Sequence, residues 1–450
     1  MQRAVVLGGS VAGLLAARVL SDHTDEVVIL EPDNLQQGGI AGGAPHRQQL
    51  HALLAMGRTQ LDRWFPGFTR ELVADGARLG TGQAVQFYVD GILRPSVTGV
   101  EMIGATRPFL ENHVRRRTLL LPNVHLRVGR ARDLIFSGSR VCGVRFSPAD
   151  DSPGTGNEDE LDADFVVDAM GRSSRLGTWL QRADWDPAPL SRLRIDLGYA
   201  TATFHRGDEL PDTVIAHSAP GPFSDYQPTL CEPGALTAVE DNRWAVVLAG
   251  YSHHRPGRDA DGFRARMRRC VAPLREVANN CPMVGDVRPF HFRESQRRNF
   301  TRLDRFPGGL AAVGDSVASV NPIYGQGLTL ATLQASALSA HLRAGASPHA
   351  AAWGYFRRSD AIVNAAWQLA TTADLAQPHV TGPYPRGYRL TRWVGDKLTA
   401  ASVIDPLVNT AFMNVVHMRA HPRTLTRPAL LLRAAHVLTG LRRNPPASAT

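Results

Sequence analysis

The first 33 residues constrain the fold most, because they read as a β-strand, a glycine-rich turn, an α-helix and a second strand. Apolar residues 4–7 fit a strand that is buried on both faces, and Gly8, Ser10 and Gly13 follow directly. Such a turn brings backbone N–H groups to a pyrophosphate at the positive end of a helix. Glu31 ends the second strand 23 positions after Gly8, where an acid can bind an adenosine ribose. The sequence therefore predicts a dinucleotide site.

Ser10 stands where the dinucleotide pattern has its second glycine. Serine is small, although its Cβ restricts the backbone more than glycine does. The alternative interpretation is an ordinary strand, turn and helix, but the strand, helix and Glu31 in this order favour the nucleotide site. The stretch does not distinguish NAD, NADP and FAD.

Two later stretches, residues 163–176 and 308–330, also place an acid and a glycine after an apolar strand. The residues that they bring to the expected ligand edge are Asp168, Gly171, Gly314 and Asp315, and the loop that follows contributes Pro322, Gly325, Gly327 and Leu328. Either stretch alone could be a structural turn. The three stretches in this order indicate one ligand site at the carboxyl ends of parallel strands.

Residues 106–121 predict a helix with Leu110, Val114 and Leu120 facing inward and its four arginines mostly on a solvated face. Arg107, at the start of this helix, is the arginine that we expect to contact a phosphate or another part of the ligand. Further predicted elements are a helix over 51–64, strands over 83–89, 124–128, 133–146, 198–204, 236–239 and 244–251, a hairpin turn at 137–139 and a surface loop over 150–160.

Composition adds mainly exclusions. A chain of 450 residues, 43% hydrophobic, should contain more than one structural unit. The net charge of +9 is almost all arginine, with Lys397 as the single lysine, and no dense basic run with aromatics indicates nucleic acid. The four cysteines are far apart, which predicts a reduced compartment and no metal site. With no apolar run of membrane-spanning length and a strand at the very start, we expect a cytoplasmic protein.

The three stretches together resemble those of the FAD-dependent monooxygenases with the aromatic-hydroxylase fold, and most resemble the bacterial polyketide epoxidases within that family. The resemblance covers roughly residues 1–342. It implies that the first turn and Glu31 bind the ADP part of FAD, and that Asp168 and Gly171 support both flavin and reductant. It also implies that Asp315 binds the ribityl chain and that residues 321–328, NPIYGQGL, lie beside the isoalloxazine ring.

The implied fold is α/β of mixed type, with a Rossmann-type FAD-binding domain, an inserted β-sheet substrate domain and a helical C-terminal region. The implied chemistry is epoxidation or hydroxylation of an apolar, polyketide-like secondary metabolite with O₂, through a flavin C4a-hydroperoxide and with NAD(P)H as transient co-substrate. The predicted division is 1–83, 106–189 and 301–345 for the FAD-binding domain, 84–105 and 190–300 for the substrate domain, and 346–450 for the helical region.

Other interpretations stay open. Relatives of this family include cyclases that use FAD as a structural part of a [4+2] cycloaddition pocket, and the FAD motifs are common to both. A redox-silent carrier would not need three intact motifs, and flavin-dependent halogenation lacks a W-x-W-x-I-P segment. No catalytic acid or base and no oligomeric state can be named. Aromatic residues that could line an apolar pocket, or form a plain core, are Tyr199, Phe204, Phe223, Tyr226, Trp244 and Tyr251. Residues 428–443 form a basic amphipathic stretch that we expect to pack on the protein rather than on a membrane.

Overall fold

The structure is a computed structural model that describes residues 1–33, 45–148, 158–220 and 231–443. Its first sheet has seven strands in the order β16-β10-β1-β2-β7-β8-β9. The strands from β16 to β7 are parallel, and β8 and β9 continue the sheet in antiparallel fashion. The strand bounds are Arg3–Leu7 (β1), Glu26–Glu31 (β2), Val124–Ser137 (β7), Arg140–Pro148 (β8), Asp159–Asp162 (β9), Phe165–Asp168 (β10) and Leu310–Ala312 (β16).

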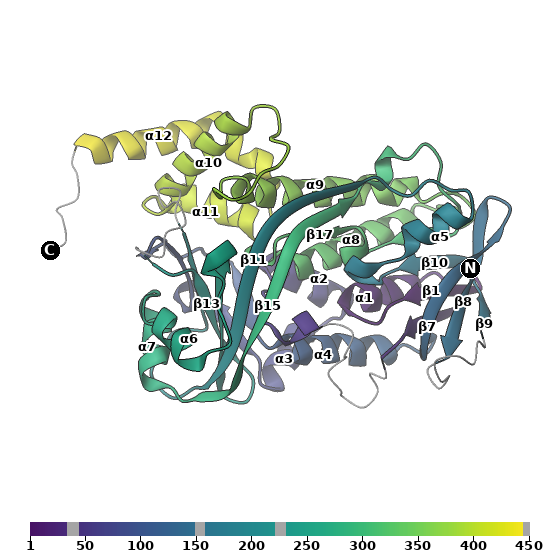
Figure 1. Cartoon of the computed structure of the whole chain (residues 1–450), viewed down its shortest axis with the longest axis horizontal. Coiled ribbons are helices and arrows are strands. Elements are labelled where there is room, and N and C mark those ends of the chain that lie inside the picture. Colours follow the sequence, from purple (N-terminus) through teal and green to yellow (C-terminus); the bar gives the residue numbers. More distant parts are fainter. Residues whose placement is uncertain (34–44, 149–157, 221–230, 444–450) are drawn as a thin grey trace.

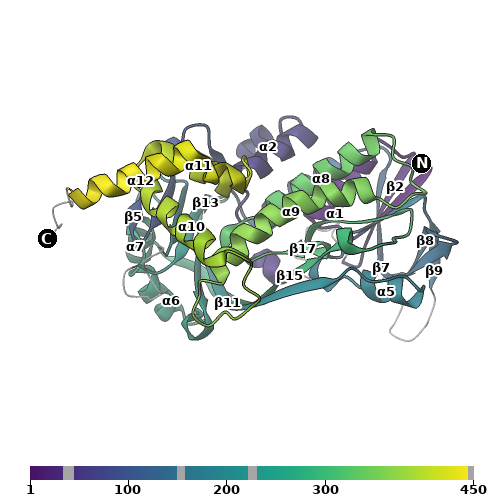
Figure 2. The same cartoon turned by 90° about the horizontal axis from the view of Figure 1, so that it is seen from above.

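The parallel strands are buried on both faces, which explains their nearly continuous apolar sequences. Helix α1 packs against α4 and α8, and α8 packs in turn against α9 (Figure 2). The helices associated with this sheet are α1 (Val11–Leu20), α2 (Ala55–Trp64), α3 (Phe68–Ala74), α4 (Arg107–Leu119), α5 (Leu176–Arg182), α8 (Gly327–Arg343) and α9 (Trp353–Asp374).

The strand register brings the three predicted ligand stretches to one edge of this sheet. Leu7 of β1 lies beside Leu30 of β2 on one side and Asp168 of β10 on the other, and Asp168 lies beside Ala312 of β16. The turns that follow these strands therefore start side by side. This confirms that the carboxyl ends of parallel strands assemble the three stretches.

The second sheet has eight strands in the order β17-β15-β11-β14-β13-β12-β4-β5. Strands β11 and β15 are 16 residues each and run from the region of α5 to that of α6 and α7 (Figure 1). A separate pair consists of β3 (Arg78–Thr81) and β6 (Glu101–Gly104). The bounds in the large sheet are Val85–Val89 (β4), Ile92–Leu93 (β5), Leu190–His205 (β11), Ile215–Ala219 (β12), Gly234–Val239 (β13), Arg243–Tyr251 (β14), Met283–Arg298 (β15) and Ala318–Ser319 (β17). The three strands predicted within 198–251 are thus confirmed.

Two apolar clusters divide the aromatic residues of this sheet. Phe204 and Trp244 are fully buried against α6 (Ala260–Met267) and α7 (Ala272–Asn280), so they form a plain core and no pocket wall. Tyr199 and Tyr251 belong to a second cluster, which Ile323 of the expected flavin loop also contacts. Phe223 and Tyr226 lie outside the described residues, as do the glycines between 38 and 43.

The C-terminal region contains α10 (Tyr388–Ser402), α11 (Pro406–Val416) and α12 (Pro428–Arg443), which lie together at the end of the molecule far from the N-terminus (Figure 2). Helix α12 contacts α10 and α11, and its Ala434 is buried among them. This confirms that residues 428–443 pack on the protein. Within the described residues, no helix combines the length and the apolar character that crossing a bilayer requires.

Several sequence-based predictions need correction. The helix predicted from residue 51 begins only at Ala55, because residues 51–54 are not helical and Leu54 has an extended backbone. A separate 3₁₀ turn covers residues 45–48. The strands predicted over 124–128 and 133–146 are divided differently: residues 124–137 form one strand, β7, and β8 follows after the confirmed turn at 137–139. Two side chains of the predicted helix over 106–121 lie on the opposite side from the one predicted. Leu120, predicted to face the core, directly follows α4 and is 72% exposed, whereas Arg115, predicted to face solvent, is buried. The predicted loop over 150–160 lies mostly outside the described residues, and its last two residues begin β9. The domain division stays a prediction.

Candidate FAD site

The first turn is shaped by glycines that no other residue could replace without a clash. Gly8 has φ +113°, and its N–H donates to the carbonyl of Leu30. A Cβ on Gly13 would lie 1.8 Å from the carbonyl oxygen of Gly8, so strand and helix could not approach this closely with any side chain there. The N-terminus of α1 carries no side-chain cap. Its free N–H groups therefore form an anion-binding end.

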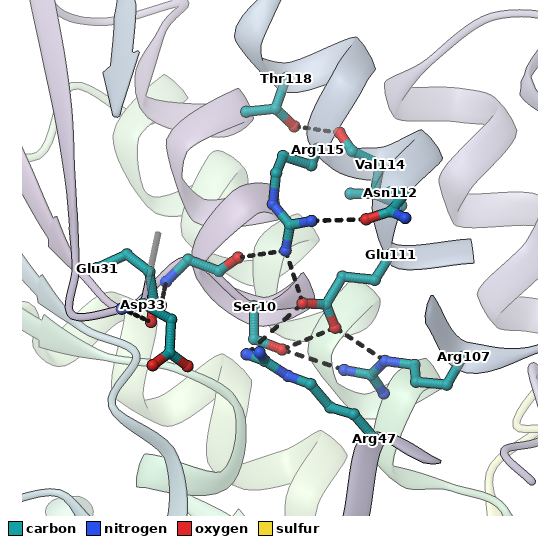
Figure 3. Close-up of polar contacts among 11 residues, drawn as sticks. Ser10, Glu31, Asp33, Arg47, Arg107, Glu111, Asn112, Val114, Arg115 and Thr118 are labelled. Atoms are coloured by element: carbon teal, nitrogen blue, oxygen red, sulfur yellow. Dashed lines mark hydrogen bonds and ion pairs between the residues drawn. The ribbon is translucent and has the colours of Figure 1, made fainter. Parts of the chain in front are cut away.

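Ser10 has a role that its position in the turn did not predict. Its hydroxyl donates to Oε2 of Glu111 (3.2 Å) and accepts from a guanidinium nitrogen of Arg107 (3.1 Å), so it ties α1 to α4 (Figure 3). Arg107 also donates to Glu111 through Nε at 3.0 Å. The predicted placement of Arg107 beside the turn agrees with this geometry. A glycine at position 10 could make neither contact.

Glu111 is the centre of a buried arginine cluster, which we define as Arg47, Arg107, Arg115 and Glu111 (Figure 3). Arg115 donates to Oε1 of Glu111 at 2.9 Å and reaches the carbonyl of Gly9 at 3.5 Å. Burial raises the pKa of Glu111, but the three guanidinium groups outweigh burial and hold that pKa below its usual value. Three cations against one anion leave the cluster with an excess of positive charge beside the uncapped end of α1, which suits a diphosphate.

Glu31 lies on the other side of the turn and is 4% exposed. Its Oε2 accepts from the N–H of Gly9 at 2.5 Å, and its Oε1 accepts from the N–H of Asp33 at 3.1 Å. Burial raises the pKa of this carboxyl, and the two backbone donors oppose that rise only in part. The carboxylate is thus fixed at the end of β2, where the sequence predicted a ribose contact.

Hydrogen bonds join the second stretch, residues 163–176, to the third, residues 308–330. The carboxylate of Asp168 accepts from the N–H of Met170 (3.0 Å) and from the hydroxyls of Ser174 and Ser316. Burial raises its pKa. Ser316 also accepts from the N–H of Gly171, which has φ +73°. Because three protein donors from the second and third stretches hold this fully buried carboxylate, Asp168 acts in this geometry as a positioning residue.

The third stretch contacts α1 directly. Gly314 has φ +64°, and a Cβ there would lie 2.6 Å from the Cβ of Ala12. Its neighbour Asp315 accepts from the hydroxyl of Ser319 at 3.2 Å. Burial raises the pKa of Asp315. Arg172 donates to the same hydroxyl at 3.4 Å, so the second and third stretches meet at Ser319.

The loop at 321–328 forms a short 3₁₀ turn, Pro322–Tyr324, and then the start of α8. Gly325 takes the left-handed conformation with φ +65°, and a Cβ there would lie 2.8 Å from that of Ala52. Helix α8 has no side-chain cap, Gly327 at its start is exposed, and Leu328 is buried. The open N–H groups of α8 are suited to an electron-rich partner.

Asn321 anchors this loop to a buried carboxyl group that sequence analysis missed. Oδ1 of Asp374, at the end of α9, accepts from Asn321 (2.6 Å), Tyr324 (3.1 Å) and, more weakly, Tyr251 (3.5 Å). Asp374 is fully buried, and burial raises its pKa to about 7. Its Oδ2 has no hydrogen-bond partner within the described residues. A proton can therefore be held beside the loop near neutral pH.

A cleft of about 680 Å³ opens beside Arg172. Four arginines outnumber its two acids, and Asp196 is already paired with Arg255 and His291. Its lining residues are Arg172, Arg194, Asp196, Arg255, His291, Arg293 and Glu294. The cleft suits an anionic ligand. Arg172 connects it, through Ser319, to Asp315.

Comparison with known proteins shows which family the chain belongs to. It is 31% identical over 435 residues to protein Rv3254 of Mycobacterium tuberculosis, covering 91% of this chain and 88% of that protein. The chain belongs to the same family as Rv3254. No family model matches the sequence. The flavin-dependent brominase Bmp2 superposes with a TM-score of 0.66 at 15% identity, over 98% of this chain and 99% of the brominase. The p-nitrophenol 4-monooxygenase PnpA of Pseudomonas putida DLL-E4 superposes with a TM-score of 0.63 at 16% identity, over 95% of this chain and 100% of the monooxygenase.

The fold is therefore that of the FAD-dependent monooxygenases, as the sequence resemblance implied. The site residues fit FAD on four observations. These are the clash-limited turn at Gly13, the uncapped start of α1 beside the arginine cluster, the fixed carboxylate of Glu31 and the uncapped start of α8 at Gly327. Together they offer donors to a diphosphate and to a ring edge, and an acceptor to a ribose.

Sequence reasoning missed Glu111, Arg115, Arg47 and Asp374. A signal for the first two was present, because Arg107, Glu111 and Arg115 are spaced four residues apart and so share one helix face. Arg47 and Asp374 carry no local signal, since their partners are distant in sequence. Glu71, Asp75 and His113 could also offer ligand atoms to a metal ion, but Arg116 already pairs with both acids.

Proposed function

We propose that this protein is an FAD-dependent monooxygenase that epoxidises or hydroxylates an apolar, polyketide-like secondary metabolite with NAD(P)H and O₂. One observation carries the proposal. Three stretches that are far apart in the sequence, residues 1–33, 163–176 and 308–330, meet at one edge of the first sheet, where the uncapped N-termini of α1 and α8 lie. The resemblance of these stretches to the polyketide epoxidases supports the substrate class. The apolar cluster around Tyr199, Tyr251 and Ile323, which borders the expected flavin loop, also suits an apolar substrate.

Different residues of the site would bind different parts of the cofactor. Glu31 would accept from the adenosine ribose, the start of α1 and the arginine cluster would hold the diphosphate, and Asp315 would accept from the ribityl hydroxyls. The start of α8 at Gly327 would stabilise negative charge at the pyrimidine edge of the ring. Bound FAD would supply the activation of O₂, which no protein side chain provides.

The chain's own residues would then orient the substrate and exclude water. The apolar side chains of Tyr199 and Ile323 would keep the region over the flavin loop dry. Asp374, held by Asn321 and Tyr324, would keep a proton within the hydrogen-bonded network of that loop. The arginine-lined cleft beside Arg172 supports docking of the phosphates of NAD(P)H near the flavin.

The first experiment tests the cofactor. The purified protein should be yellow and release FAD on denaturation, and Asp315→Ala should lower FAD affinity by about tenfold or more, since a charge-assisted hydrogen bond contributes roughly 1.5–3 kcal/mol. Asp304→Ala, which changes a carboxylate outside the site stretches, is the matched control and should keep the colour. A colourless wild-type protein that cannot be reconstituted with FAD would contradict the proposal.

The second experiment tests the reaction. The FAD-loaded protein is reduced anaerobically with NADPH or NADH in the presence of candidate polyketides and is then mixed with ¹⁸O₂. Flavin bleaching followed by a product that carries one ¹⁸O atom supports the oxygenase. A product of unchanged mass, formed while the flavin stays oxidised, would instead indicate the redox-neutral cyclase. A brominated product formed only with bromide present would indicate the activity named for Bmp2.

A further inference from the structure

A buried arginine without a carboxylate partner lies far along the sequence from the FAD stretches. Arg94 follows β5 and is 8% exposed. Its guanidinium donates to the hydroxyl of Ser402 (2.5 Å) and to Oδ1 of Asn409 (3.2 Å), and its Cζ lies 4.6 Å from the centroid of the Phe412 ring. Burial lowers its pKa to about 10, so it stays charged at neutral pH. No ion pair joins it to a carboxylate in the ranges that the structure covers.

The guanidinium borders a small cavity between β4 and α11. The cavity has a volume of about 10 Å³, close to the smallest that holds one water molecule, so a halide ion or a carboxylate group enters it only when the lining side chains move apart. Its polar lining consists of Arg94, Asn409 and His417, and the rest is mostly apolar. Phe87 of β4 is one of its apolar lining residues.

His417 supplies the second observation. The side chain is fully buried at the end of α11, with its ring edge-on to Phe87 at 5.5 Å between centroids. Neither ring nitrogen has a hydrogen-bond partner among the described residues. Burial lowers the pKa of His417 to about 4, so the neutral ring keeps one N–H to donate. An unmade hydrogen bond of this kind is unfavourable, and a ligand that accepts from the ring N–H would remove that cost.

We propose that this cavity binds a small monovalent anion, with Arg94 supplying the balancing charge and His417 an N–H donor. The anion is either a free halide ion or the carboxylate end of an organic ligand. A water molecule could satisfy His417 but would leave the arginine uncompensated, and a buried charge without a counter-ion is unfavourable. Asn409 cannot replace the anion, because the Oδ1 that accepts from Arg94 belongs to a neutral amide, and its amide nitrogen donates to the carbonyl of Pro95.

The site also has a defined relation to the expected flavin loop. Phe87, which lines the cavity, packs against His217 at 5.8 Å between ring centroids. His217 in turn makes a hydrogen bond with the backbone of Ile323. Phe87 and His217 therefore link the cavity to the loop. Anion binding does not depend on the proposed redox reaction. The experiments can therefore contradict the anion site without contradicting the proposed function, and the reverse.

The test uses the full chain with its natural cofactor content. Crystals grown in sodium gluconate, an anion too large for the cavity, are soaked in sodium bromide, and the anomalous signal of bromide is measured. A peak within hydrogen-bond distance of Arg94 and His417 is expected. In solution, bromide and acetate that replace gluconate at constant ionic strength should raise the melting temperature in a saturable manner.

Two variants make the result specific. Arg94→Met should raise the dissociation constant of bromide by about tenfold or more, because a charged hydrogen bond is worth roughly 1.5–3 kcal/mol. If Arg94→Met fails to fold, His417→Phe tests the donor and should weaken binding by a smaller factor. Arg433→Gln is the matched control, since that arginine pairs with Asp405 at the start of α11 and should leave bromide affinity unchanged.

The two sources are separated by competition. Longer carboxylates, from acetate to hexanoate, should displace bromide if the cavity opens toward an organic ligand, whereas a closed halide site should admit bromide and exclude hexanoate. No anomalous peak at Arg94, together with a melting temperature that does not respond to bromide or acetate, would overturn the proposal.

Discussion

The buried carboxyl of Asp374 should make the stability of the protein depend on pH in a defined direction. Its pKa is raised from 3.8 to about 7 in the folded protein, mainly by burial. Below pH 3.8 the folded and unfolded states both hold the proton, and the stabilising contribution is fully present. As pH rises toward 7 the unfolded state loses its proton first, so stability falls, and above about pH 7 the loss is complete. The full loss corresponds to about 4 kcal/mol, at about 1.36 kcal/mol per pH unit.

Asp374→Asn removes this titration while keeping the shape of the side chain. Between pH 5 and pH 8 the wild-type protein should lose about 2.5 kcal/mol that the variant does not lose. With an unfolding entropy of about 2.1 cal/mol/K per residue, a chain of 450 residues should show a difference in melting temperature of about 2–3 °C.

The assay is thermal unfolding of the FAD-loaded wild type and variant, followed by circular dichroism at several pH values between 5 and 8. Asp360→Asn is the matched control, because it removes a carboxylate from the same helix that pairs with Arg297 at a partly exposed site. This control should keep the wild-type slope. Parallel melting curves for wild type and Asp374→Asn across the whole range would refute the reasoning.

Two further predictions concern the FAD stretches. Gly314→Ala and Gly171→Ala both place a side chain at positive φ, but only at Gly314 does the new Cβ meet another atom, the Cβ of Ala12 at 2.6 Å. Gly171→Ala should therefore lower the melting temperature by about 1–2 °C and Gly314→Ala by clearly more; equal losses would contradict the clash. Glu111→Gln should cost about 3 kcal/mol because it leaves three buried arginines without their anion. Glu71→Gln in α3 breaks more exposed ion pairs with Arg116 and Arg117 of α4 and should cost at most about 1 kcal/mol. Similar losses for the two variants would show that burial does not set the difference.

Local sequence patterns predicted the positions of those site residues that directly follow a β-strand. An apolar run followed by glycine or acid places Gly8, Asp168 and Gly314 correctly, because parallel strands bring their carboxyl ends to one edge. The same patterns did not predict what each side chain does. Asp168 turned out to hold the second and third stretches together, since its hydrogen-bond partners lie up to 148 positions away.

The arginines of α4 show why a local rule can fail. Three consecutive arginines are usually solvated, and Arg116 follows the rule, but Arg115 faces the first turn because Glu111 lies one helical turn before it. Asp374 could not be found from the sequence at all, because its environment comes from β14, the loop at 321 and α9. Tertiary contacts alone determine that environment.

The long strands β11 and β15 also determine how the protein can be divided. At one end, the side chains of Gln296 and Arg298 of β15 both donate to the carbonyl of Arg172, and the backbone N–H of Arg298 donates to the carbonyl of Val317. At the other end Met283 of the same strand pairs with Phe204 of β11. Figure 1 shows this end of the two strands near α6 and α7. A fragment cut out between the two sheets would therefore take with it the support of the second and third stretches. We expect neither half to fold into a flavin-binding unit when it is expressed without the other.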